Sequence, residues 1–427
     1  MADTEKDKKP PKDGFPTASQ PGSSAVIEDH IEPFTLLSVL GEGGFGIVYL
    51  AEQKHPIKRQ VALKILKPGM DSRRIVARFE AERQALALLD HPNIAHVLEA
   101  GSAESGRPYF VMEYIKGLPI TEYCDYHQLN IAERLRLYIQ VCEAIGHAHQ
   151  KGIIHRDIKP SNILVNDQDE TALPKIIDFG VAKAIGMPLT DKTLITQQGQ
   201  LLGTPEYMSP EQADFKERDI DTRTDIYSLG VVLYELVAGV LPFESCTLRE
   251  AGYTEIQRII REQEPPRPSS RLSHLGQDAA RVAQNRHTEL STLVRNLHQE
   301  LEWIPMKAIR KDRKLRYQTA SELAQDIRNY LEGDPLIAGP ESASYRIQKF
   351  VQKYKVPVMA VVTIAVLIVI SLLTITALYI RSEKLKRETI MAKVDAEKAR
   401  DEIERQMYNH SMALADASKV YNVKYAR

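Results

Sequence analysis

The stretch HRDIKPSN at residues 155–162 places an acid, a cation and an amide close together, at Asp157, Lys159 and Asn162. A helical run precedes it and the apolar ILVN follows it, so this polar stretch is predicted to be a loop. Asp157 can accept a proton from a hydroxyl group, and Lys159 can neutralise negative charge on a transferred phosphoryl group. A polar loop capped by Asn and Asp would explain each of these residues taken alone.

A second polar motif, DFG at residues 178–180, begins sixteen residues beyond Asn162. Its Asp178 ends the run KIID, which is expected to pair with ILVN as a short strand. Asn162 and Asp178 should then lie at the ends of facing strands. An amide and a carboxylate placed there make an oxygen-rich site suited to Mg²⁺, which takes few protein ligands and binds phosphates as well.

A glycine-rich turn, LGEGGFGIVY, carries glycines at positions 41, 43, 44 and 46 between two expected strands. Glycines let backbone amides approach a phosphate at points where a Cβ atom would collide with it. A plain β-turn explains this stretch about as well when it is taken alone. No helix follows the last glycine, which disfavours a dinucleotide-binding Rossmann fingerprint.

Lys64 lies in the apolar run VALKIL, where a lysine on an exposed edge strand is the simplest explanation. In the helix expected after it, Ile75, Phe79 and Leu86 define the inward stripe, and Glu82 falls on the same stripe. A carboxylate that faces a core needs a cation nearby. A pair between Lys64 and Glu82 therefore explains the position of both residues.

The expected elements divide into a β-rich part followed by a helical part. Strands are predicted at 34–40, 46–53, 60–66 and 108–114, and helices dominate after Gly117. The main helices expected are 131–149, with one apolar face, the buried 224–239, with Thr224 as cap and Gly239 at its end, and one that carries Leu323, Ile327 and Leu331. We therefore expect an α+β fold with a cleft around residues 113–118.

Taken in order, these motifs resemble those of eukaryotic-like (Hanks-type) bacterial receptor-like Ser/Thr protein kinases. Further markers are SPE at 209–211, where the family has A-P-E, Arg316, which matches the arginine that pairs with Glu211, and Asp225, which matches the aspartate that braces the catalytic loop. The resemblance covers about residues 34–332. It implies a bilobal protein-kinase fold, with a β-rich N-lobe at 34–113 and a helical C-lobe at 118–332.

The same resemblance implies a role for each matching position. Asp157 is the base, Lys159 assists it, Lys64 pairs with Glu82 and holds phosphates, and Asn162 with Asp178 holds Mg²⁺. The positions implied to bind ATP are Leu40, Gly41, Glu42, Gly43, Gly44, Phe45, Gly46, Val48, Ala62, Lys64, Met112, Glu113, Ile115 and Leu164.

Substrate class and regulation are also implied by the resemblance. Lys159 together with Thr204 in GTPEY is typical of the Ser/Thr-specific kinases, whose partners are protein substrates. Arg156 is implied to be a cation that a phosphorylated activation loop neutralises. Thr196, eight residues before Thr204, is the expected site of autophosphorylation, although the threonines of this segment could also be ordinary polar loop residues.

Composition limits the other classes of function. The formal net charge of −1 gives no indication of a nucleic-acid partner. Cys124, Cys142 and Cys246 form no CxxC pair, which argues against zinc or a disulfide scaffold and suits a reducing compartment. Residues 1–33 mix charge with Pro, Ser and Gly and lack the apolar core of a secretory signal, so we expect a disordered tail and a cytoplasmic kinase domain.

Residues 356–380 carry no charge over 25 positions and are long enough for a single transmembrane helix after a juxtamembrane linker at 333–355. The remaining 381–427 is expected to be a short extracytoplasmic helical segment, so the protein would cross the cell membrane once with its C-terminus outside. The flanking charges oppose this orientation. Residues 336–355 hold four Lys and Arg and residues 381–400 hold seven, and the flank with more positive charge usually lies in the cytoplasm. The need of a kinase domain for cytoplasmic ATP and Mg²⁺ decides our expectation.

Two alternatives to an active membrane-tethered kinase remain. A pseudokinase scaffold would usually lack Lys64, Asp157, Asn162 or Asp178, all of which are present. A small-molecule phosphotransferase is disfavoured by the complete segment from DFG to SPE. Beyond the apolar segment, Val394, Ile403, Met407 and Leu414 follow a loose coiled-coil spacing that fits either a homodimer contact or a solvated stalk helix.

Overall fold

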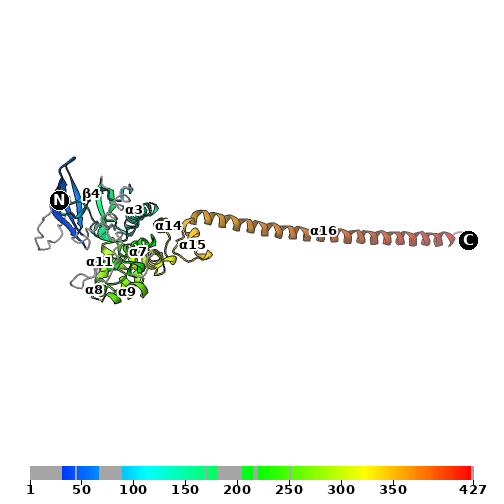
Figure 1. Cartoon of the computed structure of the whole chain (residues 1–427). Helices are drawn as coiled ribbons and strands as arrows, with labels where there is room; N and C mark the ends of the chain where they lie inside the picture. The colour runs from blue at the N-terminus through cyan, green and yellow to red at the C-terminus, as the bar shows by residue number, and fades with distance from the viewer. Residues whose placement is uncertain are drawn as a thin grey trace, which may run out of the picture. The chain divides into compact units, whose positions relative to one another are not determined.

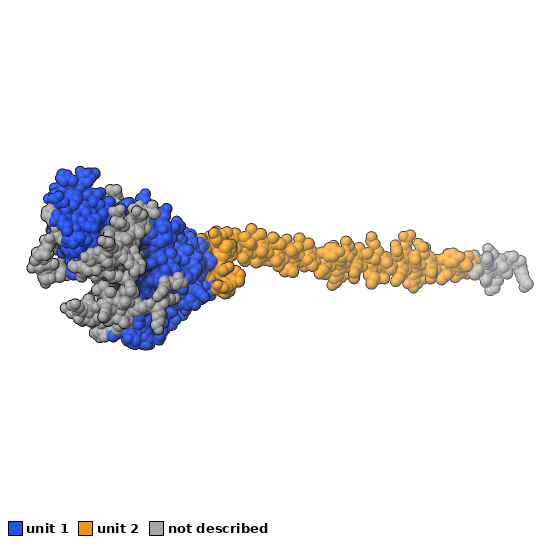
Figure 2. All heavy atoms as spheres, in the orientation of Figure 1, with its two compact units in different colours: residues 1–340 blue, residues 341–427 orange. Residues whose placement is uncertain are grey.

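The structure is a computed structural model, and it describes residues 31–43, 46–66, 89–168, 171–179, 204–214, 220–250 and 252–424. The chain forms two compact units, Met1–Pro340 and Glu341–Arg427, which are coloured separately in Figure 2. The helix expected to carry Glu82 and the segment with Thr190, Thr193 and Thr196 lie outside the described residues.

The N-terminal part of the first unit is a five-stranded antiparallel sheet with the strand order β1-β2-β3-β5-β4 (blue to cyan in Figure 1). All four predicted strands are present, and β4 is an addition that its weak apolar alternation did not reveal. Alternate side chains of the strands point to one face of the sheet, and that face is buried. It includes Ala51, Val61, Leu63 and Val111. The strands are β1 (Phe34–Glu42), β2 (Gly46–Gln53), β3 (Arg59–Leu66), β4 (Val97–Ser102) and β5 (Pro108–Glu113).

The rest of the first unit is helical around one large apolar core. Its helix α3 (Ile131–Gln150) begins with a capping box, in which Asn130 and Glu133 satisfy each other's backbone amides. α3 packs against α7 (Arg223–Ala238) and α14 (Ala320–Glu332), and α7 packs against α13 (Trp303–Ala308). The β-rich lobe and the helical lobe expected for a protein-kinase fold are therefore confirmed.

The predicted cap of α7 is wrong in detail. The helix begins one residue before Thr224, its N-cap position is Thr222, and no side chain caps it. The hydroxyl of the fully buried Thr224 instead donates to Glu211 Oε1 at 2.9 Å. The end of the helix is as predicted, because Gly239 adopts a left-handed backbone with φ 73°.

A small second sheet with the order β6-β7-β8 sits in the helical lobe and carries both polar motifs. β7 (Ile163–Gln168) pairs antiparallel with β8 (Thr171–Ile176), so Ile163 faces Ile176. The turn η1 (Pro160–Asn162) leads into β7, and Asp178 and Phe179 of the DFG motif follow β8 after Ile177. The other elements of the first unit are β6 (Leu118–Pro119), α2 (Ile120–Tyr126), η2 (Pro205–Tyr207), α6 (Pro210–Ala213), α8 (Ser245–Glu250), α9 (Tyr253–Glu262), α10 (Pro268–Ser273), α11 (Asp278–Gln284), α12 (Leu290–Asn296), η3 (Leu297–Leu301) and η4 (Arg313–Leu315).

The second unit consists of α15 (Ala343–Lys353) and the long α16 (Lys355–Lys424). α16 is continuous through residue 380, where the sequence predicted the end of the apolar segment. It is one helix, among the residues that the structure describes, that is long and apolar enough to cross a membrane.

Candidate active site

The loop between α3 and β7 brings its acid, cation and amide together. The Asn162 amide nitrogen donates to the Asp157 backbone oxygen at 2.8 Å and to its carboxylate Oδ2 at 3.2 Å. Lys159 Nζ lies 2.9 Å from the same Oδ2 and 3.5 Å from the Thr204 hydroxyl. About a quarter of the Asp157 side chain is exposed, so its carboxylate is held in place and still reachable by a substrate hydroxyl.

Asp225, at the start of α7, holds this loop from inside the lobe. Its two carboxylate oxygens accept 2.8 Å hydrogen bonds from the backbone amides of His155 and Arg156, and Oδ2 also lies 2.8 Å from His149 Nε2. Full burial raises the pKa of Asp225, but these donors outweigh it and hold the pKa below its usual range. The chain bends at Arg156, which has a left-handed backbone with φ 66°.

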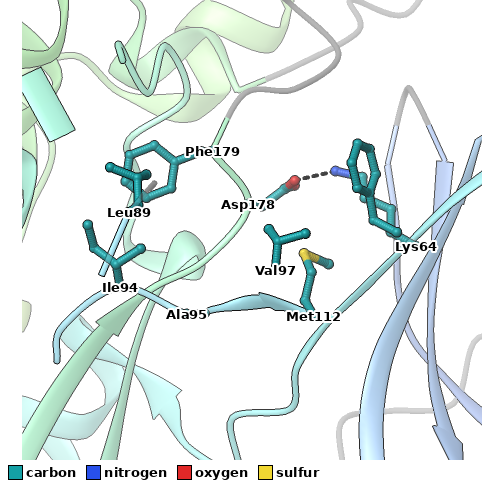
Figure 3. A pocket seen from close by; sticks show the side chains of 9 residues that line it. Lys64, Leu89, Ile94, Ala95, Val97, Met112, Asp178 and Phe179 are labelled. Carbon is teal, nitrogen blue, oxygen red and sulfur yellow. Dashed lines mark hydrogen bonds and ion pairs between the residues drawn. The ribbon is translucent and has the colours of Figure 1, made fainter. Parts of the chain in front are cut away.

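The DFG motif meets the N-lobe through Lys64, whose ammonium group contacts the Asp178 carboxylate (Figure 3). The Ile177 amide donates to the Asn162 backbone oxygen at 2.9 Å, so Asp178 and Asn162 lie on adjoining ends of β8 and β7. Phe179 packs on the His155 ring with centroids 4.6 Å apart. The predicted partner of Lys64, Glu82, lies outside the described residues.

Asn162 and Asp178 have the donor set that Mg²⁺ requires. Both hydrogen bonds from the Asn162 side chain use its amide nitrogen, so its amide oxygen on the other branch is available as a ligand. Asp178 contributes a carboxylate beside a cation, and its backbone is left-handed with φ 58°. Mg²⁺ takes few protein oxygens together with phosphate oxygens and water, so these two ligands fit it.

Most of the predicted nucleotide positions lie on four neighbouring strands, β1, β2, β3 and β5, and on the segment after β5, while Leu164 lies on β7. Across the sheet, Val48 pairs with Lys64, and Ala62 pairs with Met112. Val48 is partly buried and Ala62 is buried, and Leu164 pairs with Pro119 across the small sheet. Exposed predicted positions are Leu40, Gly41, Glu42 and Gly43, with Gly44 and Phe45 outside the described residues, while Gly46 and Ile115 are buried.

Behind Met112, a small apolar pocket runs from Lys64 to Phe179 (Figure 3). Leu89, Ile94 and Val97 also line the pocket, and the first two of them belong to the core of the helical lobe. Its apolar lining keeps the ammonium and carboxylate groups in a partly dry environment, where their attraction is stronger than in water.

The segment between the lobes contains an ion pair that the sequence analysis did not identify. Glu113 accepts from the buried Lys175 of β8 at 2.8 and 2.9 Å, and His96 Nδ1 lies 3.2 Å from it. Partial burial raises the pKa of Glu113, but the bonds from Lys175 and His96 outweigh it and lower the pKa. Lys175 follows Pro174 and precedes Ile176 in a predicted strand, and a lysine within a strand was also the first observation about Lys64.

The region after the activation segment is fixed by a buried ion pair. Arg316 donates to Glu211 through two bonds, Nη1–Oε1 at 2.7 Å and Nη2–Oε2 at 2.9 Å. Ser209, where the family has alanine, caps α6 by accepting from the Gln212 amide, and the Gln212 side chain donates to the Arg156 backbone oxygen at 2.7 Å. Ser209 therefore has a structural role as the cap of α6. Through Gln212, α6 is linked directly to the catalytic loop.

A family described as the protein kinase domain matches residues 34–327 of the chain. The chain belongs to the protein kinase family. It is 40% identical over 252 residues to the serine/threonine-protein kinase pkn3 of Myxococcus xanthus, covering 55% of this chain and 43% of that protein. It is 34% identical over 305 residues to the serine/threonine-protein kinase PrkC of Bacillus subtilis, covering 71% of this chain and 41% of that protein.

Among solved structures, the crystal structure of the PknI kinase domain of Mycobacterium tuberculosis matches with a TM-score of 0.48 and 23% identity. That match covers 70% of this chain and 97% of the other. The chain spans about two-fifths of the length of the curated relatives named above. Both polar motifs, Lys64, Asp225 and Arg316 all lie within the part that matches the kinase family.

Proposed function

We propose that this kinase transfers the γ-phosphoryl group of ATP to serine and threonine hydroxyls of proteins, as a non-specific serine/threonine protein kinase. The observation that carries the proposal is the catalytic loop, in which Lys159 and Asn162 both contact the Asp157 carboxylate. Asp225 holds the same loop through the backbone amides of His155 and Arg156, just before Asp157. The relatives pkn3 and PrkC are named as serine/threonine-protein kinases, which supports this class, and Lys159 beside Thr204 fits it.

In the proposed reaction, the oxygen of a substrate hydroxyl attacks the γ-phosphorus of ATP. A P–O bond forms to that oxygen, the bond between the γ-phosphorus and the oxygen bridging to the β-phosphate breaks, and ADP leaves. The hydroxyl proton passes to Asp157 Oδ2, the oxygen that Lys159 and Asn162 already hold in position. Lys159 neutralises charge on the transferred group, and Lys64 holds the α- and β-phosphates.

Mg²⁺, when bound, neutralises phosphate charge and orients the γ-phosphoryl group for in-line transfer. Asn162 and Asp178 would hold it at the adjoining ends of β7 and β8. The backbone from Glu113 to Ile115 would bind the adenine, and the Lys175–Glu113 ion pair positions that segment. The glycine turn, in which the Gly43 amide donates to the Gly46 oxygen at 2.9 Å, would cover the phosphates.

The direct test is phosphate incorporation into a generic protein substrate with ATP and Mg²⁺, comparing the protein with Asp157→Asn. We expect the rate to fall by roughly 10²- to 10⁴-fold, because a positioned base is lost. Asp167→Asn is the matched control, since it alters a carboxylate on β7 that accepts from the Tyr123 hydroxyl away from the loop. Equal incorporation in the protein and in Asp157→Asn would contradict catalysis by this loop.

We propose further that autophosphorylation of Thr196 activates the kinase by giving Arg156 a phosphate partner. The backbone of Arg156 is held by Asp225 and Gln212, so a charge placed on its guanidinium acts on a fixed point of the catalytic loop. Phosphopeptide mapping of the active enzyme should find phosphate on Thr196, and Thr196→Val should lower activity. Active enzyme that carries no phosphate at Thr196 would contradict this regulation.

The long α16 supports our proposal that the kinase is a single-pass membrane protein of a signalling pathway, with the kinase domain in the cytoplasm and the C-terminus outside. Its apolar residues 356–380 are exposed along the helix, as lipid contact requires. The helix beyond them could pair with a second copy through Val394 and Ile403, giving a homodimer. A reporter fused after residue 427 tests the orientation, and reporter activity seen only with a cytoplasmic C-terminus would contradict it.

A further inference from the structure

α15 has an exposed apolar face directly before the candidate membrane span. Ile347, Phe350, Val351 and Tyr354 lie at positions i, i+3, i+4 and i+7, so they share one face of the helix and its end. Between 41% and 62% of each of these side chains is exposed. A face of this kind on a surface helix needs an apolar environment to cover it.

Basic residues border this face on one side. Arg346 and Lys353 are exposed and lie beside the apolar stripe, and Lys355 follows at the start of α16. Glutamines at 348 and 352 lie on the other side of the apolar face from these basic residues. The sequence contains no acidic residue between Glu341 and Glu383, so the whole stretch is positively charged and suits an anionic surface.

The chain changes direction between the two helices. Tyr354 belongs to neither helix, and its backbone angles, φ −108° and ψ 43°, interrupt the helical path before α16 starts at Lys355. If α16 crosses the membrane from about residue 356, then α15 ends at the height of the lipid headgroups. Tyrosine is common at that height, because its ring is apolar and its hydroxyl group reaches water.

We propose that α15 is an interfacial helix that lies in the headgroup region of an anionic membrane, with Ile347, Phe350 and Val351 inserted among the acyl chains. This inference rests on the proposed membrane span of α16. A helix with an apolar face and a basic border binds such surfaces through both features together. The basic border and the direct connection to the span favour lipid over a protein partner.

The test uses the full chain with Cys246→Ser, because the other two cysteines are buried, and with one new cysteine at a time. The cysteines carry an environment-sensitive fluorophore and replace Ile347 or Phe350 on the apolar face, Gln348 or Gln352 on the polar side, or Val366 in the span. Each protein is reconstituted into phosphatidylcholine vesicles, with and without phosphatidylglycerol. A water-soluble quencher then reports which labels lipid protects.

We expect labels at 347 and 350 to be protected several-fold more than labels at 348 and 352, and more strongly with phosphatidylglycerol. Arg346→Gln with Lys353→Gln should reduce that protection in the anionic vesicles. Lys393→Gln with Lys398→Gln removes the same charge from α16 beyond the apolar segment and should leave the protection unchanged.

The label at Val366 separates this inference from the proposed membrane span. Protection at 366 with equal quenching at 347, 348, 350 and 352 would overturn the interfacial helix while the span stands. Quenching at 366 would overturn the span and the inference together. Protection at 347 and 350 that is equal in both kinds of vesicle, and unchanged by Arg346→Gln with Lys353→Gln, would overturn the binding of α15 to an anionic surface.

Discussion

At the scale of single residues, Asp225 carries its charge at full burial because three donors surround it. Two of these donors are the consecutive backbone amides of His155 and Arg156, just before Asp157, the proposed base. One carboxylate therefore fixes the path of the chain at the point where the base must be positioned. A buried charge of this kind is stable only while each donor remains.

Asp225→Asn should both destabilise the protein and lower the rate of phosphoryl transfer. The amide keeps one accepting oxygen, but its NH₂ group then faces a backbone N–H that also donates. We expect a loss of about 2–4 kcal/mol in the free energy of unfolding. We also expect kcat to fall by about 10- to 100-fold through displacement of Asp157, while KM for ATP changes little. Urea unfolding and steady-state kinetics measure the two effects.

The control for that substitution is Asp221→Asn, close by in sequence. Asp221 is about one-third exposed and pairs with Arg223 at 2.6 Å at the start of the same helix. Its loss should cost less than about 1 kcal/mol and leave kcat unchanged. Equal losses in the two variants would show that Asp225 has no special part in holding the loop.

His155 should make the stability depend on pH. Burial lowers the pKa of its imidazole below the ordinary 6.5, despite the nearby carboxylates of Asp225, Asp157 and Asp178. As pH falls below 6.5, the unfolded chain binds a proton there that the folded protein does not bind. The free energy of unfolding should therefore fall with pH, by at most about 1.4 kcal/mol per pH unit from this group.

Urea unfolding at a series of pH values from 8 downward checks this dependence. His155→Gln removes the titrating group and should flatten the fall in stability below about pH 6.5. His298→Gln, which alters a side chain that is 70% exposed, should leave the slope as it is. A slope that persists unchanged in His155→Gln would assign the pH dependence to other groups.

At the scale of elements, the position of α7 depends on its close contact with α13 at Gly230. A Cβ atom at that position would lie 2.6 Å from the Ala308 Cβ and 2.7 Å from the Ile309 Cγ2. Gly230→Ala should therefore force the two helices apart and cost about 1–3 kcal/mol, even though alanine favours the helix. Because α7 carries Asp225, a fall in kcat should accompany the loss, and urea unfolding with kinetics measures both.

Gly146→Ala provides a matched change in the middle of α3. The nearest atom to its added Cβ would be the Ser321 hydroxyl oxygen at 3.2 Å, which can rotate away. Alanine there should be neutral or stabilising by about 0.5–1 kcal/mol, since it restricts the unfolded chain. A similar loss of unfolding free energy in both variants would mean that the close contact between α7 and α13 does not explain the effect of Gly230→Ala.

The elements also show what sequence patterns can predict. Apolar periodicity located α3, α7 and the main strands, because each pattern lies within one stretch of chain. Lys175 and Glu113 are 62 residues apart, and His149 and Asp225 are 76 apart, so local patterns cannot pair them. A local pattern can also mislead. Thr224 was predicted to cap α7, but it lies inside the helix and its hydroxyl bonds to Glu211 instead.

At the scale of the whole molecule, the proposed membrane location rests on the exposed apolar stretch of α16. Arginine in the middle of a membrane span costs about 2.5–3.5 kcal/mol per residue. The double substitution Leu367→Arg and Ile370→Arg should therefore move the chain from the membrane fraction to the soluble fraction. The active site belongs to the first unit, so phosphorylation per molecule should be unchanged.

Leu385→Arg with Ile390→Arg is the matched control for this prediction. It places the same two charges on α16 beyond residue 380, at exposed positions in a charged stretch. This variant should stay with the membranes after an alkaline wash, because its apolar segment is intact. A double variant at 367 and 370 that also stays there would show that α16 does not anchor the protein by spanning the bilayer, and that the tether must be sought in another part of the chain.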